Sequence, residues 1–292
     1  MKKIFIVTLI AVSLWACTDR SSREPTAKPA TPSEAASVFL DKHQGHAPDG
    51  VIGDRRIRPG YYLQMDVLAT TRNFIQIWLP EICTYKGQKK PFFLLSSEDL
   101  YQMNLDTTAT GGISISGKAG EQLMITGTAE EFEYGLYLTV NQQNISDMVL
   151  EEVSSSVCIQ LTAAPDFRDP ERENTYWYNE GTGTWDQSFI TESLIQEGIE
   201  RTRFYRTVME PEQGLPLVVV ESSTGSHALG LIFKNATGVG GNSQMSTGCI
   251  HSDGDSYTIA PGKSASREGL LIIHPEGKEA VLEMAREFLA AK

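Results

Sequence analysis

Histidine and cysteine are scarce in this sequence, which contains five histidines and four cysteines in 292 residues. No C-x-x-C or H-x-x-x-H pair occurs, so the spacing of these residues predicts no metal site. Basic residues are also outnumbered, with 25 lysines and arginines against 37 acidic residues and a net charge of −12. An acidic surface repels phosphate groups, and no basic run offsets this repulsion. The sequence therefore predicts no nucleic-acid partner.

An apolar run near the N-terminus extends from Ile4 to Leu14, which is too short to span a bilayer comfortably. Two lysines before the run and a small residue after it are typical of a secretory signal. Residues 1–16 are therefore predicted to be a signal peptide. Because Cys17 follows Ala16 directly, the segment resembles a bacterial lipoprotein signal that is cut before an acylated cysteine.

This resemblance implies that Cys17 is lipidated and that its acyl chains hold the protein on a lipid bilayer. Thr18, rather than aspartate, follows Cys17, and by the same resemblance this favours an outer-membrane or cell-surface lipoprotein. An ordinary secretion signal with a chance cysteine is the alternative. Residues 17–38 are rich in Ser, Thr, Pro and Ala, so we expect a flexible tether, followed by one domain over 39–292.

Strand-like segments dominate the predicted domain. Short runs of β-branched and aromatic residues alternate with turn residues, and no regular helix separates consecutive pairs of runs. This spacing favours an antiparallel sandwich or barrel over a parallel α/β sheet. The runs cover residues 73–79, 112–117, 123–143, 154–164, 215–223, 227–233 and 269–274.

Two segments have helical spacing of their apolar residues. In residues 186–206, Phe189, Leu194 and Ile199 recur at roughly helical intervals, although Gly198 weakens the pattern. At the C-terminus, KEAVLEMAREFLAAK places its apolar residues in one stripe. We therefore predict a mostly-β fold with a C-terminal helix that closes over a sheet.

Residues 144–185 contain the motif Cys-Ile-Gln-Leu, and residues 227–277 contain the motifs Cys-Ile-His-Ser-Asp and Ala-Pro-Gly. These two long stretches resemble the galactose-mutarotase-like superfamily. The resemblance covers the chain from about Tyr61 onward. It implies an antiparallel β-supersandwich whose concave face commonly receives sugars, so a saccharide is the predicted partner. Fold resemblance does not establish activity, which depends on the residues of the site.

The sequence GCIHSDGDSY places Cys249, His251, Asp253 and Asp255 at every second position. If this segment is extended, the four side chains leave the backbone on one face. Three interpretations follow: two ligands of a metal site, a turn beside a buried cysteine, or a His251–Asp253 pair that contacts a sugar. Because no further paired ligands are visible, we predict no metal and no other cofactor.

Active mutarotases pair a histidine acid with a glutamate base, so the resemblance implies candidate catalytic residues. His43 and His46 lie in a polar segment and His274 ends a strand, which leaves His227 and His251.

The predicted catalytic pair is His251 with Glu221, which ends the run LVVVE. The predicted ligand-binding residues are Asp253, Arg267, His227, Trp177 and Trp185. The two tryptophans belong to TYWYNEGTGTW, an aromatic segment predicted to be a loop at the rim of the cleft.

Cys83, Cys158 and Cys249 remain once Cys17 is assigned to lipid, and an exported compartment permits a disulfide. We predict Cys158 with Cys249, because both lie in strand-like segments. Three buried free thiols are the alternative.

The favoured function is a membrane-anchored lipoprotein that binds carbohydrate without turning it over. The alternative is a sugar-active enzyme, an aldose epimerase or a polysaccharide lyase-like protein, that uses a His/Glu acid–base pair. A tethered structural or interaction protein is a third hypothesis.

Overall fold

The computed structural model describes eleven segments of the chain, all within the compact unit Thr31–Lys292. The predicted signal peptide, Cys17, His43 and His46 lie outside them. The described residues are 36–39, 50–52, 55–57, 63–67, 73–88, 92–93, 104–162, 164–196, 199–208, 214–243 and 248–291.

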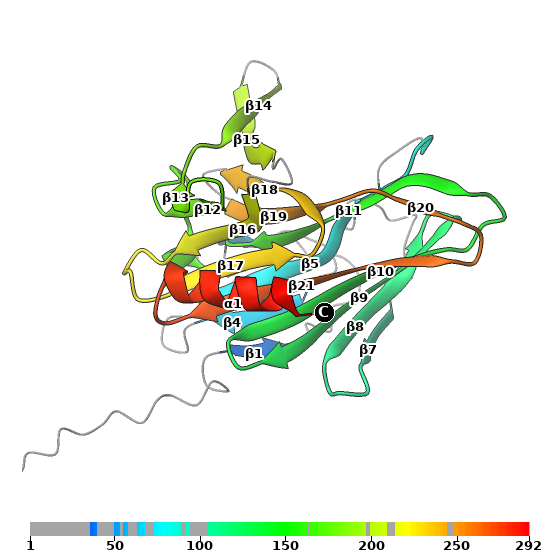
Figure 1. Ribbon diagram of the computed structural model, residues 1–292, viewed down its shortest axis with the longest axis horizontal. Coiled ribbons are helices and arrows are strands. Elements are labelled where there is room, and N and C mark those ends of the chain that lie inside the picture. Colours follow the sequence, from blue (N-terminus) through cyan, green and yellow to red (C-terminus); the bar gives the residue numbers. More distant parts are fainter. Residues whose placement is uncertain are drawn as a thin grey trace, which may run out of the picture. The chain divides into compact units, whose positions relative to one another are not determined.

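The first sheet has ten strands in the described part of the chain, and all of its strand pairs are antiparallel (Figure 1). Its main order is β1-β4-β5-β11-β19-β18-β15-β14, while β6 pairs with β5 and β20 pairs with β11. The strands are β1 (Ala36–Phe39), β4 (Leu63–Val67), β5 (Asn73–Thr84), β6 (Phe92–Phe93), β11 (Leu150–Gln160), β14 (Ile190–Gln196), β15 (Ile199–Val208), β18 (Ala236–Ser243), β19 (Gly248–Gly254) and β20 (Tyr257–Ile259).

The second sheet has nine described strands, in the order β13-β12-β16-β17-β21-β10-β9-β8-β7, and it is also antiparallel throughout. Its strands are β7 (Asn104–Thr107), β8 (Ile113–Ala119), β9 (Leu123–Phe132), β10 (Gly135–Asn144), β12 (Thr175–Asn179), β13 (Thr184–Asp186), β16 (Gly214–Glu221), β17 (Ala228–Phe233) and β21 (Ser264–His274). The remaining elements are the hairpin β2 (Gly50–Ile52) and β3 (Arg55–Ile57), the 3-10 helix η2 (Pro165–Phe167), and helix α1 (Lys278–Ala290).

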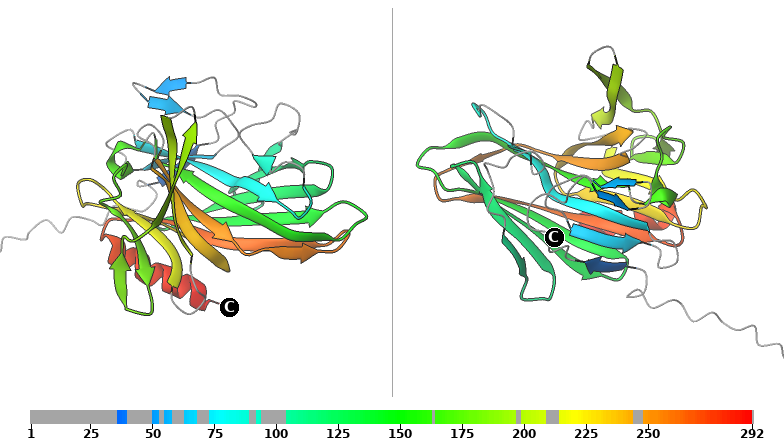
Figure 2. Two further views of the ribbon diagram at one scale, coloured as in Figure 1. Left: turned by 90° about the horizontal axis from the view of Figure 1, so that it is seen from above. Right: turned by 180° about the vertical axis from the view of Figure 1, so that it is seen from behind.

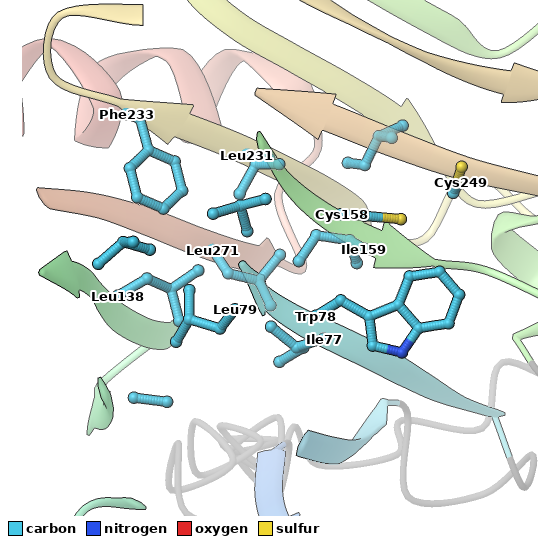
Figure 3. Packing of buried hydrophobic residues seen from close by; sticks show 14 of the residues in the cluster. Ile77, Trp78, Leu79, Leu138, Cys158, Ile159, Leu231, Phe233, Cys249 and Leu271 are labelled. Atoms are coloured by element: carbon cyan, nitrogen blue, oxygen red, sulfur yellow. The ribbon is translucent and has the colours of Figure 1, made fainter. Parts of the chain in front are cut away.

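The two large sheets pack face to face over one apolar core (Figure 2). Strand β8 alternates buried and partly exposed residues, which is the pattern of a strand that covers a core with one face. The core combines residues of both sheets, such as Ile77 and Ile159 of the ten-stranded sheet with Leu138, Leu231 and Leu271 of the nine-stranded sheet (Figure 3). The predicted mostly-β antiparallel sandwich is therefore confirmed.

Helix α1 covers the other face of the nine-stranded sheet, and the predicted C-terminal helix is confirmed (Figures 1 and 2). Its apolar stripe, Val281, Leu282 and Ala285, is buried against residues of β16, β17 and β21. The helix approaches β17 closely at Gly230, where an added Cβ would lie 2.3 Å from Val281 Cγ1. No helix among the described residues is long and apolar enough to cross a membrane.

The predicted helix over 186–206 is wrong, because this segment forms the antiparallel hairpin of β14 and β15. Leu194 belongs to β14 and Ile199 begins β15, so the apolar residues of the expected helical stripe are divided between two strands. The edge of the ten-stranded sheet provides backbone partners for β15, and tertiary pairing of this kind overrides weak helical spacing.

The segment TYWYNEGTGTW also differs from its prediction, because β12 and β13 pair as a hairpin within it. At the other end of the chain, β1 begins at Ala36 and pairs with β4. The last residues of the predicted tether 17–38 are therefore part of the sheet.

Candidate functional site

Strands β5, β11 and β19 lie side by side in the ten-stranded sheet, and alternation sends their side chains to two opposite faces. Leu79 points toward the nine-stranded sheet, since a Cβ on Gly127 of β9 would lie 2.9 Å from Leu79 Cγ. We call the opposite side of the ten-stranded sheet the outer face. By strand register, the outer face carries Gln76, Trp78, Ser156, Cys158, Gln160, Cys249, His251 and Asp253.

Figure 3 shows this division for the labelled residues: the Trp78 ring and the sulfurs of Cys158 and Cys249 lie away from Leu79 and Leu271. The segment GCIHSDG is extended and forms β19, so the condition for a shared face holds for Cys249, His251 and Asp253. Asp255 lies beyond the end of this strand.

Neighbouring strands place His251 and Asp253 beside specific partners. Cys158 of β11 is opposite His251, and Ser156 is opposite Asp253. The Ser156 hydroxyl donates a hydrogen bond of 2.8 Å to Asp253 Oδ1. On the far side of His251, β18 presents Gly240, which has no side chain. At Gly240 the strand β15 approaches closely, because an added Cβ would lie 2.2 Å from the carbonyl oxygen of Tyr205. The half-buried His251–Asp253 pair is therefore bordered by a serine, a cysteine and a crowded glycine.

The imidazole of His251 contacts a thiol and a carboxylate with the same nitrogen. Its Nε2 lies 3.1 Å from Cys249 Sγ and 3.3 Å from Glu81 Oε2. Burial opposes the positive charge, but Cys249, Glu81 and Asp253 outweigh burial and raise the pKa of His251 to about 10. At neutral pH the imidazole is therefore protonated and paired.

Glu81 reaches His251 because β5 contains two extra residues at this point. Ser156 pairs with Ile82 and Cys158 pairs with Trp78, so three residues of β5 oppose a single residue of β11. A bulge of this kind re-aims a side chain. The sequence contains one signal for it, since Pro80 interrupts an otherwise regular strand and proline in a strand is confined to edges and bulges.

Two buried donors on the outer face have no hydrogen-bond partner among the described residues: Gln76 Nε2 and Trp78 Nε1. Both side chains are at most 1% exposed. Buried polar atoms are usually satisfied, so an orphaned pair on one face suggests a missing partner.

The structure does not contain the predicted disulfide, because neither Cys158 nor Cys249 is bonded to another cysteine. Cys158 lies opposite His251 and Cys249 lies opposite Gln160, which makes the two cysteines diagonal neighbours. Diagonal residues are about 7–8 Å apart, beyond the span that a disulfide bridges without backbone movement. Burial, together with the adjacent Cys249 thiol, raises the pKa of the Cys158 thiol well above its usual range.

The third thiol, Cys83, faces the core and accepts a 2.9 Å hydrogen bond from Gln142 Nε2. It belongs to the opposite face of the sheet from Cys158 and Cys249.

Register nevertheless brings three metal-ligand types together on the outer face. The ligand atoms of Cys158, Cys249 and His251 all lie within 4.8 Å of one another. Sequence spacing showed Cys249 and His251 but not Cys158, which comes from another strand. The prediction of no metal depended on the absence of a further ligand residue in the sequence. The structure brings Cys158 beside Cys249 and His251 as that further ligand residue.

Arg267 lies between the two sheets rather than on the outer face. It is 2% exposed, its Nη1 donates to the carbonyl oxygen of Ser155, and its guanidinium lies 4.9 Å from the centre of the Phe233 ring. Burial lowers the pKa of Arg267 to about 10. This position makes it a core residue and not a contact for a ligand on the outer face.

Glu221 lies on the face of the nine-stranded sheet that α1 covers. There its carboxylate accepts a 2.7 Å hydrogen bond from Lys278 Nζ. Alternation explains this, since Val220 belongs to the core between the sheets and Glu221 points the opposite way. The structure therefore does not bring Glu221 to His251.

His227 lies at the same end of the nine-stranded sheet as Glu221. Its Nδ1 lies 3.0 Å from Ser226 Oγ, and burial, together with the charge of His274, lowers its pKa. It is not part of the outer face.

The two predicted aromatic ligands point to opposite sides of the β12–β13 hairpin. Trp177 packs into the core and donates from Nε1 to the carbonyl oxygen of Ser188 at 3.2 Å. Trp185 lies toward α1 and donates from Nε1 to Glu279 at 2.7 Å. Neither residue joins His251 and Asp253, so the hairpin does not form the predicted rim beside them.

Comparison with known proteins gives a distant likeness in fold. No protein-family model matches the sequence, and no curated protein matches it significantly. The solved structures with a similar fold include galactose mutarotase-like proteins. This is the superfamily that the motifs in 144–185 and 227–277 resemble.

One matching structure is a galactose mutarotase related enzyme from Lactobacillus acidophilus, with 10% identity, a TM-score of 0.47, and coverage of 76% of this chain and 97% of that chain. A second is a galactose mutarotase-like protein from Lactobacillus casei, with 8% identity, a TM-score of 0.48, and coverage of 75% and 95%. A third is a galactose mutarotase-like protein from Clostridium acetobutylicum, with 9% identity, a TM-score of 0.39, and coverage of 74% and 95%.

Proposed function

We propose that this protein binds carbohydrate on the outer face of its ten-stranded sheet and does not turn the sugar over. The observation that carries the proposal is the pair of orphaned buried donors, Gln76 Nε2 and Trp78 Nε1, on the face that carries His251 and Asp253. A saccharide offers hydroxyl groups that both donate and accept, so one sugar ring can satisfy such donors and a carboxylate together. Binding sites combine apolar and aromatic surface with a few polar groups of this kind.

Two observations argue against turnover. The Nε2 atom of His251 already contacts Cys249 and Glu81, so this nitrogen is not open to a substrate proton. Glu221, the base that the sequence suggested, is paired with Lys278 on a face of the other sheet.

The binding test compares two variants that each replace a carboxylate with its matching amide. Glycan-array screening of the protein first selects a saccharide, and calorimetry then measures its affinity. Asp253→Asn is expected to weaken binding about tenfold or more, since a hydrogen bond to a charged group contributes about 1.5–3 kcal/mol. Glu221→Gln is the control and is expected to bind as wild type does. Absence of binding to every saccharide on the array, or equal losses in the two variants, would contradict the proposal.

A sugar-active enzyme is the second candidate, because Glu81 forms a carboxylate–imidazole pair with His251 at 3.3 Å. Polarimetry of freshly dissolved α-D-glucose and α-D-galactose separates the candidates. A binding protein leaves the rate of anomer exchange unchanged. If the wild-type protein accelerates anomer exchange and the His251→Ala variant does not, the protein is a sugar-active enzyme instead.

The membrane anchor is the other half of the proposal, and the N-terminal sequence supports it. Cleavage after Ala16 and acylation of Cys17 would tether the domain to the outer membrane or cell surface through residues 17–38. Mass spectrometry of the N-terminal peptide from membrane fractions tests this. A mature peptide that carries no acyl group on Cys17 would contradict the proposed anchor, and the proposed sugar site would be unaffected.

A further inference from the structure

We propose that Cys158, Cys249 and His251 bind a zinc ion on the outer face, with Glu81 as the fourth ligand. The first three residues offer two sulfurs and one nitrogen within 4.8 Å of one another, and the Glu81 carboxylate lies beside the same nitrogen. This inference does not rest on saccharide binding. It concerns an ion held by the side chains of three adjacent strands.

The two separations at His251 Nε2 are close to those of a tetrahedral site. With Zn–S near 2.3 Å and Zn–N or Zn–O near 2.0–2.2 Å, ligand atoms of one zinc lie roughly 3.3–3.8 Å apart. Glu81 Oε2 and His251 Nε2 are 3.3 Å apart, which is within this range. Cys249 Sγ and His251 Nε2 are 3.1 Å apart, so binding requires their separation to grow by only a few tenths of an ångström.

The sheet fixes three of the side chains on regular strands and the fourth on a bulge. Cys249 and His251 are two residues apart on β19 and share a face, and Cys158 is directly opposite His251 on β11. Glu81 comes from the bulge of β5, which bends that strand toward the pair. The diagonal placement of Cys158 and Cys249 that disfavours a disulfide still lets both sulfurs approach one ion.

The ligand chemistry favours zinc over calcium, magnesium and an iron–sulfur cluster. Thiolate and imidazole are poor ligands for calcium and magnesium, which prefer oxygen, and an iron–sulfur cluster normally takes four cysteines. Two cysteines, one histidine and a carboxylate form a set that zinc accepts in its usual four-coordinate geometry. Binding requires deprotonated thiols and a neutral imidazole, so protons are released as the ion enters.

Four protein ligands leave no open position on the metal. Such closed sites stabilise folds, whereas catalytic zinc keeps a position for water or substrate. The ion would therefore join β5, β11 and β19 on the outer face, which agrees with a protein that does not turn over sugar.

The test measures metal content and ligand type in the full-length protein. Elemental analysis after chelator treatment, reloading with Zn²⁺ and removal of unbound ion is expected to give about one zinc per chain. Cys158→Ser and Cys249→Ser are each expected to lower this by roughly tenfold or more. Cys83→Ser is the matched control, because Cys83 is equally buried but faces the core, and it is expected to retain the zinc.

X-ray absorption of the zinc-loaded wild type keeps the proposal testable if the serine variants fail to fold. We expect two sulfur neighbours and two nitrogen or oxygen neighbours around the ion. Zinc content near zero in wild type, a zinc shell without sulfur, or full zinc retention in a folded Cys249→Ser variant would overturn the proposal. Calorimetry with the array-selected saccharide, before and after chelation, gives a separate result for the sugar site.

Discussion

Replacing Arg267 with alanine is expected to lower the free energy of unfolding by about 3 kcal/mol or more, whereas replacement with methionine costs much less. Alanine leaves a cavity between the two sheets, where Arg267 is 2% exposed and packs over Phe233. Methionine fills most of that volume without placing a charge there. The Nε and Nη2 atoms of Arg267 have no hydrogen-bond partner among the described residues, so methionine loses only the bond from Nη1 to the Ser155 carbonyl oxygen and the cation–π contact with Phe233.

Urea unfolding followed by circular dichroism measures this difference. Arg286→Ala is the control, because Arg286 pairs with Glu180 on the surface and such pairs contribute about 0–1 kcal/mol. If methionine destabilises the protein as much as alanine does, the charge and its bond to Ser155 hold the sheets together and the volume argument is wrong.

Trp78→Ala is expected to cost about 3–5 kcal/mol of stability, because this large side chain is fully buried. Trp78→Phe keeps an aromatic ring in the buried position and removes the orphaned Nε1–H donor together with part of the indole volume. We therefore expect Trp78→Phe to remain folded and to bind the array-selected saccharide about fivefold to tenfold more weakly, as for one lost hydrogen bond of about 1 kcal/mol.

The matched control is Trp185→Phe, which removes an indole donor that already bonds Glu279 on the α1 side of the protein. Saccharide affinity is expected to be unchanged in that variant. Calorimetry on both phenylalanine variants, each checked for folding, measures the contrast. Equal affinities in Trp78→Phe and wild type would mean that the Trp78 donor does not face the sugar.

The sequence was sufficient to predict the fold class because most of the strands have strong local patterns. Runs such as 112–117 and 269–274 have β-branched or apolar residues bounded by turn residues, and both became strands of the nine-stranded sheet. The C-terminal helix was predictable for the same reason, since its apolar stripe has a clear period. The segment 186–206 was mispredicted because its stripe was weak and its conformation depends on pairing with β18.

The candidate site was only partly predictable. The two-residue period of β19 placed Cys249, His251 and Asp253 on one face, as the alternation required. Register between strands could not be predicted from spacing, so the approach of Cys158 was missed. Glu81 was missed because it depends on a bulge. Glu221 was wrongly predicted to lie beside His251, because the sequence of a strand does not show which sheet it belongs to or which face its last residue occupies.

The central claim is that the outer face of the ten-stranded sheet is the functional surface, and hydrogen–deuterium exchange with and without the array-selected saccharide tests it most directly. We predict slower exchange in peptides from residues 76–82, 154–160 and 249–253 when the sugar is bound. Protection confined to residues 214–221 and 278–290, on the side of α1, would contradict the claim and move the site to the other sheet.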